Sequence, residues 1–414
     1  MKIKLPRIKS NEILFFFSYI VFLVTSILAT SFYYQYFDRF HNYIIIFCIL
    51  LLIMQELLVR KIRSKELVVF LICALLCIIS LRVSQGAMMR LIPCTFLYVF
   101  SARKSDINKI FIVTITVSVL MLLLIILSAY LGIITNYVSY RRLGNRSRRE
   151  YLGFRYVLYP AGYISNVISL YIYLKKEKIK IFEIIMLFCL NYWCYAKTDS
   201  RLSFYLSSSI LLYALVKHIG DRKKKKHSSS MITKIGKAVF GFFSSYSFVI
   251  CAIFSIMLSA LYTPTNPQLR AINEFFSNRL SLGKNALVTY GASLLGGRIQ
   301  FVGFGLNSQG EMSVEQYNYV DSFYVQFLIR FGIVFMILLL CLLTYTQVKY
   351  RKSNDVYMMV LLSVMALHCI VDDLFMQLFF NGLWFAIGNI VLKQNESIKN
   401  SLDGNKRQKI LNLR

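Results

Sequence analysis

Residues 111–134 read FIVTITVSVLMLLLIILSAYLGII and contain no Asp, Glu, Lys or Arg. A helix of this length, rising about 1.5 Å per residue, crosses the roughly 30 Å hydrocarbon core of a bilayer. Similar uncharged runs cover 13–37 and 238–262. The chain of 414 residues is 57% apolar and only 16% charged, which leaves too little polar surface to cover a soluble core. We therefore predict an all-α, polytopic membrane protein.

Apolar segments recur along the whole chain, and about twelve of them can be interpreted as transmembrane helices. The predicted spans are 12–32, 42–59, 66–82, 87–102, 108–131, 156–174, 181–197, 202–219, 238–261, 320–346, 356–371 and 374–392. The connections between them alternate between Lys-rich and Lys-poor. By the positive-inside rule the Lys-rich set is cytoplasmic, which places both termini inside and the protein in the plasma (inner) membrane. The first span is too long for the apolar core of a cleaved signal peptide, so we expect it to be retained.

The net charge of +29 comes largely from the Lys-rich connections. The run 222–226 (RKKKK) lies between two spans and has no interleaved aromatic residues. We interpret it as a loop facing anionic lipid headgroups rather than a nucleic-acid site. All nine cysteines fall inside apolar segments, where they are expected to pack, and none has metal-ligand spacing. The sequence thus predicts membrane lipids as a partner, with no nucleic acid, metal or cofactor.

The connection 132–156 breaks the charge pattern, because it is predicted to be external yet is rich in arginine. It contains one acid, Glu150, and no lysine. Its arginines are Arg141, Arg142, Arg146, Arg148, Arg149 and Arg155. Guanidinium groups make forked contacts with phosphate or carboxylate groups, so this loop favours an anionic substrate. A locally inverted topology is the alternative. It would break the alternation of Lys-rich and Lys-poor connections both before and after this loop.

The segment 262–319 is by far the longest connection and is also predicted to be external. Pro264 and Pro267 end the preceding helix. Apolar residues then recur at helical spacing over 269–280, which predicts an amphipathic helix on the membrane surface or across the end of the bundle. The glycine-rich stretch 291–310 follows, and it contains Arg298. A long ordered loop of this kind is usually functional.

Several charged residues lie inside or beside the predicted spans, where an isolated charge is costly. They are Arg90, Asp199, Arg201, Asp321, Arg330, His368, Asp372 and Asp373. The predicted topology places all of them toward the external side, which indicates an outward-facing polar site. Simpler interpretations are an ion pair between Asp199 and Arg201, a solvated turn at 372–373, and a hydrogen-bonded packing role for His368. An arginine buried within a span would need an acidic partner.

Several stretches on the external side resemble motifs of the Wzy-type polysaccharide polymerases, within the larger group that also contains the O-antigen ligases. Residues 197–201 (KTDSR) resemble a Thr-x-Ser-Arg turn that begins a span. Residues 278–282 (NRLSL) resemble a Gly-Arg segment of the large external loop, and 303–305 (GFG) resemble the Gly-x-Gly that follows it. Residues 321–324 (DSFY), leading to 331–333 (FGI), resemble the motif that enters the next span.

The chain departs from these motifs at two positions. It has Asn278 where the family has glycine before the loop arginine. It has Asp321 where the ligases usually carry histidine, so a base role cannot be transferred directly and the ligase interpretation loses weight.

The resemblance implies that a glycan repeat unit carried on undecaprenyl pyrophosphate is joined to another unit at the outer leaflet, with release of undecaprenyl pyrophosphate. It implies that Arg201 and Arg279 stabilise the leaving group. The first candidate to orient or deprotonate the acceptor hydroxyl is Asp321, and the second is Asp199. The further substrate contacts expected are Arg90, Arg141, Arg142, Arg155, Arg298 and Arg330.

Two other functions remain open at this point. A ligase would move finished glycan to a different acceptor, and a flippase would transport the lipid-linked unit without changing it. Transporters commonly show internal repeats and broken helices at the membrane midplane, whereas the distinctive polar residues here lie in external loops. The flippase and the chain-length regulator of the same pathway are the protein partners that a polymerase would have.

Overall fold

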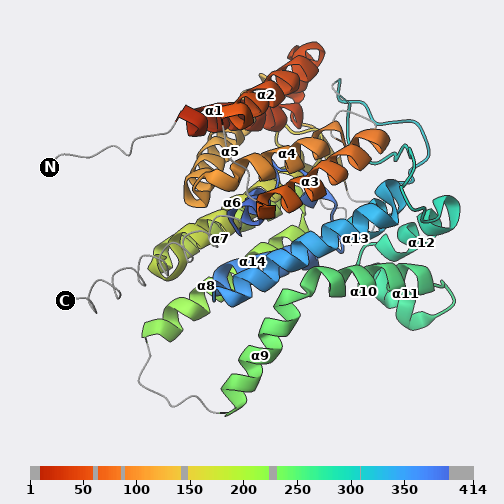
Figure 1. Cartoon of the computed structure of the whole chain (residues 1–414). Coiled ribbons are helices and arrows are strands. Elements are labelled where there is room, and N and C mark those ends of the chain that lie inside the picture. The colour runs from red at the N-terminus through yellow and green to blue at the C-terminus, as the bar shows by residue number, and fades with distance from the viewer. Residues whose placement is uncertain are drawn as a thin grey trace, which may run out of the picture.

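The computed structural model describes residues 10–58, 64–84, 89–140, 148–222, 231–307 and 309–390. Within these ranges the chain is helical apart from loops and one hairpin, formed by β1 (Val138–Tyr140) and β2 (Arg148–Glu150). The α-helices are α1 (Ser10–Ala29), α2 (Asp38–Leu58), α3 (Ser64–Val83), α4 (Ile92–Ser101), α5 (Ile107–Tyr130), α6 (Tyr159–Lys175), α7 (Ile181–Thr198), α8 (Arg201–Arg222), α9 (Met231–Ser245), α10 (Ser247–Leu261), α11 (Pro267–Phe275), α12 (Arg279–Tyr290), α13 (Phe323–Lys352) and α14 (Val356–His368). Figure 1 shows the long helices side by side, with α11 and α12 at one end of the bundle.

Six of these helices are long and apolar enough to cross a membrane: α1, α2, α3, α5, α8 and α13. A seventh span results if α9 and α10, which meet at a 63° bend, are counted together. The prediction of an all-α membrane bundle is confirmed at this level. The remaining predicted spans correspond to shorter or more polar helices, so length and composition do not establish twelve spans. The last predicted span opens with 3-10 turns, and its residues 391 and 392 lie outside the described part of the chain.

Lysine side chains mark one end of the bundle, where α6 and α13 finish and α7 and α14 begin. Lys175 Nζ lies 3.0 Å from Glu183 Oε1, which joins the end of α6 to the first turn of α7. Lys176 Nζ lies 3.1 Å from Asp355 Oδ2, at the start of α14. Pairs of this kind contribute little stability, but they show which helix ends share one side of the molecule. We refer to this side as the Lys-rich end.

The segment 262–319 crosses the opposite end and contains two helices, where the apolar spacing over 269–280 predicts one. Residues 276–278 separate α11 from α12, and two of them, Ser277 and Asn278, have positive φ angles of 53° and 66°. The Asn273 side chain holds this corner, because its amide donates to Asn278 Oδ1 at 3.1 Å. Asparagine tolerates a left-handed backbone better than most residues, which gives a physical reason for Asn278 where the resembled motif has glycine.

Helix α13 is interrupted at Gly332, where φ is 90° and ψ is 174°. Residues 293–297, which belong to no helix or strand, lie against this break and bond to its backbone. The Ile333 amide donates to the Ser293 carbonyl at 3.0 Å, and the Gly297 amide donates to the Arg330 carbonyl at 3.1 Å. The break therefore anchors the glycine-rich stretch of the large loop to a membrane helix.

We expect Gly332→Ala to destabilise the protein strongly. A Cβ atom on Gly332 would lie 2.3 Å from the Gly296 nitrogen and 2.6 Å from the Leu294 oxygen, and both of these atoms belong to backbone. Strain and overpacking of this kind cost about 2–4 kcal/mol together. Thermal unfolding in detergent would measure the loss. Gly220→Ala is the matched control, because nothing lies within 4 Å of the added atom; equal midpoints for the two variants would contradict the prediction.

Candidate functional site

A cavity of about 440 Å³ opens at the end of the bundle opposite the Lys-rich end. Its wall includes all four residues predicted to be catalytic: Asp199, Arg201, Arg279 and Asp321. They come from three regions that are far apart in the sequence: the α7–α8 turn, the start of α12 and the approach to α13. We call this the arginine cavity. It also contains Arg149, a member of the Arg-rich loop.

The turn between α7 and α8 positions the first pair of charges. Asp199 ends α7 in a left-handed conformation with φ 50°. Its carboxylate accepts a hydrogen bond from Arg201 Nε at 3.1 Å, so the local ion pair forms. Arg149 Nε donates to the Thr198 carbonyl at 2.9 Å and so fixes β2 to this turn. The Arg201 side chain is 53% exposed, which leaves much of its guanidinium open to the cavity or to solvent.

Arg279 connects the start of α12 to the residues that follow α14. Its Nε donates to the Val371 carbonyl at 2.7 Å, and its Nη1 donates to the Phe276 carbonyl at 3.2 Å. The same Nε lies 3.7 Å from Asp321 Oδ2. Both side chains are largely buried. Burial raises the pKa of Asp321 above its ordinary value, although the charge of Arg279 opposes this shift.

A second cavity of about 310 Å³ adjoins the first. The two share part of their wall, which includes Arg279, Asp321 and Asp372. The wall of the second cavity is rich in rings, so we call it the aromatic cavity; its aromatic residues are Tyr156, Tyr159, Phe301, Phe304, Tyr317 and Tyr319.

Asp373 lines the aromatic cavity, and its carboxyl is held by two hydrogen bonds. Its Oδ2 accepts hydrogen bonds from the Tyr319 hydroxyl and, at 3.0 Å, from Gln326 Nε2. Burial, and next the neighbouring charge of Asp372, raise the pKa of Asp373 to about 7. A carboxyl with this pKa can exchange a proton near neutral pH, which is typical of functional sites.

His368 faces the arginine cavity rather than only packing in the core. Its Nε2 lies 3.5 Å from Asp372 Oδ2 and 3.5 Å from the Ser203 hydroxyl. Because both neighbours approach the same ring nitrogen, the three residues do not form the relay of a serine hydrolase, in which the two nitrogens have different partners.

Of the remaining predicted substrate contacts, Arg155 and Arg330 make contacts within the protein. The Arg155 guanidinium donates to the Ala29 carbonyl and lies over the Tyr34 ring at 4.6 Å, so it ties the loop to the end of α1. Arg330 is only 5% exposed; it donates to the Ile299 carbonyl at 3.3 Å and lies over the Phe301 ring at 4.7 Å. Neither residue lines the arginine cavity or the aromatic cavity.

Arg298 and Arg90 also lie outside both cavities. Arg298 is exposed, and its Nε donates to the Arg82 carbonyl at 3.1 Å. Arg90 is exposed at the approach to α4, so it needs no buried acidic partner. Arg141 and Arg142 lie outside the described residues.

Several cavity-lining residues were not predicted from the sequence; among them are Arg149, Tyr156, Phe304 and Tyr317. Arg149 belonged to the recognised arginine cluster, but nothing in that cluster distinguished it from Arg155. The chain has 28 Tyr and 33 Phe, and no sequence pattern distinguished the cavity-lining rings from the others. Within the described part of the chain, no cluster of His, Cys, Asp and Glu could hold a metal ion.

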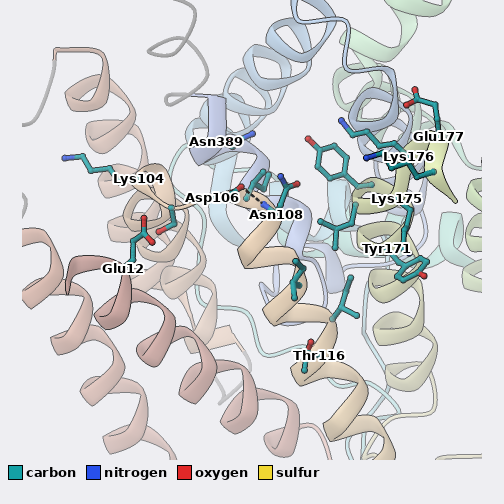
Figure 2. A pocket seen from close by; sticks show the side chains of 17 residues that line it. Glu12, Lys104, Asp106, Asn108, Thr116, Tyr171, Lys175, Lys176, Glu177 and Asn389 are labelled. Carbon is teal, nitrogen blue, oxygen red and sulfur yellow. Dashed lines mark hydrogen bonds between the residues drawn. The ribbon is translucent and has the colours of Figure 1, made fainter. Parts of the chain in front are cut away.

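A larger cavity of about 1110 Å³ lies at the Lys-rich end (Figure 2). Lys175 and Lys176 line it, but each of them is already paired with an acid, as described above. Asp106 also lines it and caps α5 by accepting the Asn108 amide at 2.9 Å. These three polar residues serve the ends of helices, and volume alone does not make this cavity the functional site. The two smaller cavities instead combine several arginines, largely buried carboxyls and aromatic rings.

No protein-family model, curated protein or solved structure compared with this chain matches it. The class of the protein therefore follows from its own fold and site. It is an α-helical membrane protein whose polar cavities open at the end of the bundle opposite its lysine-rich end.

Proposed function

We propose that this protein is a glycan polymerase that joins oligosaccharide repeat units carried on undecaprenyl pyrophosphate. The proposal includes twelve spans in the plasma membrane, with the Lys-rich end in the cytoplasm and the arginine cavity facing outward. The observation that carries it is the convergence of Asp199, Arg201, Arg279 and Asp321 on one cavity.

The arginine cavity suits a diphosphate leaving group. Negative charge builds up on the bridging oxygen as the glycosidic bond to the diphosphate breaks. Positioned guanidinium groups bind this charge more strongly in the transition state than in the ground state, which is the condition for accelerating the reaction. Arg149, Arg201 and Arg279 supply three such groups on one wall.

The carboxylate of Asp321 suits the acceptor side of the reaction. The acceptor hydroxyl oxygen bonds to the anomeric carbon of the donor while the bond from that carbon to the diphosphate breaks. The hydroxyl proton passes to the Asp321 carboxylate, whose raised pKa brings its basicity closer to that needed at neutral pH. Asp199 is less suited to this role because its carboxylate is engaged by Arg201 at 3.1 Å.

The direct test supplies purified protein in detergent with lipid-linked repeat units extracted from the source cells. A polymerase produces a ladder of longer glycans and free undecaprenyl pyrophosphate. Transfer of a whole glycan to a different acceptor would instead identify a ligase. Movement of unchanged units across liposomes, without a ladder, would replace the proposal with the flippase.

We expect Arg201→Lys to reduce chain growth by about 10²-fold, because a lysine keeps the charge but loses the forked donor geometry. The intensity of the ladder per unit of protein would measure this. Arg298→Lys is the matched control, since Arg298 is an exposed arginine on the same side that lines neither cavity. A full ladder from Arg201→Lys would remove Arg201 from the site.

A further inference from the structure

The aromatic cavity contains a pair of stacked rings that packing alone does not explain. The rings of Phe304 and Tyr317 are 4.4 Å apart at 24°, and both line the cavity. Phe304 nevertheless remains 56% exposed. An exposed ring stacked on a second ring presents a flat apolar face to whatever enters the cavity. The C–H face of a sugar is a ligand that such a face can stack against.

The backbone around this pair is held firmly in place. The Asn318 amide donates to the Val302 carbonyl at 3.2 Å, and Asn318 Oδ1 accepts from the Val302 amide at 2.6 Å. Gly303 allows this close approach, since a Cβ atom there would lie 3.1 Å from the Tyr319 ring. The two segments that carry Phe304 and Tyr317 are thus fixed to each other, which reduces the entropy lost on binding.

The polar groups of the aromatic cavity differ from those of the arginine cavity. Three aspartates line each cavity, but the arginine cavity sets Arg149, Arg201 and Arg279 beside them. In the described part of the chain, the aromatic cavity has Arg279 as its only basic lining residue, so its carboxyls are in excess. Carboxylates accept hydrogen bonds from sugar hydroxyls but repel a diphosphate. The aromatic cavity is therefore suited to an uncharged glycan and unsuited to the lipid carrier's diphosphate.

The two cavities meet where the reaction would occur. Arg279 and Asp321 belong to the walls of both. A donor diphosphate in the arginine cavity and a glycan in the aromatic cavity would approach each other beside the Asp321 carboxylate. A transferase that joins two glycans needs two subsites arranged in this way.

We propose that the aromatic cavity is the acceptor subsite, in which the Phe304–Tyr317 pair stacks on a sugar ring while Asp372 and Asp373 accept its hydroxyls. This inference rests on the proposed polymerase function. It adds a separate role for each cavity. Phe304, Tyr317 and Asp372 stand on the wall that the two cavities share, and Asp373 lines the aromatic cavity alone.

The test uses a soluble acceptor, the repeat-unit oligosaccharide freed from its lipid diphosphate by mild acid. This molecule has no leaving group, so it can only accept. With lipid-linked donor at saturation, Phe304→Ala should raise the KM for the soluble acceptor about five- to tenfold and leave the KM for the donor unchanged. Phe304→Tyr, which keeps the ring, should restore the wild-type KM. Phe275→Ala is the matched control, because Phe275 is 73% exposed on α11 and lines neither cavity.

The outcomes separate this inference from the function on which it rests. If the wild-type protein builds no ladder from lipid-linked units, the polymerase proposal fails and the subsite fails with it. If the wild-type protein builds a ladder and Phe304→Ala keeps its acceptor KM, only the subsite is wrong. A rise in the donor KM instead would assign the aromatic cavity to the donor and overturn the inference.

Discussion

Replacing Asp321 by Asn should reduce chain growth by about 10²- to 10⁴-fold, the usual contribution of a positioned general base. The amide keeps the size and the hydrogen-bonding oxygen of the side chain, but it cannot take a proton from the acceptor. Initial rates of ladder formation, compared at equal amounts of folded protein, would measure the loss. Asp199→Asn should have a smaller effect, because the Asp199 carboxylate is paired with Arg201. The reverse order of effects would identify Asp199 as the base.

The pH dependence gives a second readout for Asp321. Its pKa is raised by burial, and the carboxylate is the working form, so the rate should fall as pH decreases through this raised pKa. The fall in rate at low pH is the acid limb of the pH–rate profile. The residual rate of Asp321→Asn should lack this acid limb. An acid limb that persists unchanged in the variant would show that another group is the base.

The same raised pKa predicts the effect of Asp321→Asn on stability. A carboxyl with a raised native pKa binds its proton more tightly in the folded state, so its contribution to stability is full below the unfolded pKa and declines as pH rises through the native pKa. Asn cannot ionise and avoids this decline. The unfolding midpoint of the variant at neutral pH should therefore equal or exceed that of the wild type, which separates lost catalysis from lost folding.

Replacing Arg279 by Lys should reduce chain growth by about 10²- to 10³-fold, the cost of removing a positioned donor from a developing anion. The Arg279 guanidinium donates to the Val371 and Phe276 carbonyls and lies beside Asp321, and a single ammonium group cannot occupy all three positions. The ladder assay would measure the rate, with Arg298→Lys as the control. Wild-type chain growth in Arg279→Lys would exclude Arg279 from the site.

A structural role for Arg279 can be separated from a catalytic one. The lost carbonyl contacts should lower the free energy of unfolding by about 1–3 kcal/mol, which thermal unfolding would detect. Arg279→Gln also removes the charge that lowers the pKa of Asp321, so the pKa of Asp321 should rise further. The acid limb of the pH–rate profile of this variant should therefore move to higher pH. A variant that is destabilised but keeps its rate and acid limb would assign Arg279 to structure alone.

Some of the candidate site could be predicted from the sequence because its residues are tied to local features. Asp199 and Arg201 occupy a two-helix turn, and a short turn places neighbouring charges together whatever the rest of the fold does. Asp321 lies just before a long apolar helix, so its position at the end of the bundle followed from the span itself. The resemblance to polymerase motifs added Arg279, which composition could not have distinguished from the other loop arginines.

The other arginines could not be sorted in this way, because their placement depends on long-range packing. Arg149 reaches the cavity through the register of the β1–β2 hairpin, in which Ser139 pairs with Arg149. Arg155, six residues later, turns instead toward the end of α1. Arg330 lies on the buried face of α13 against Phe301, and that face is set by how the helix packs.

Hydrophobicity and charge act locally along each span, so the amino-acid sequence was enough to predict a helical membrane protein with chemically different ends. Which of the polar residues meet depends instead on long-range contacts. The left-handed turn at Asn278, the break at Gly332 and the pairing of 302 with 318 bring distant segments together. Such contacts depend on backbone geometry and on packing between segments far apart in the chain, and neither is encoded in the periodicity of a single helix.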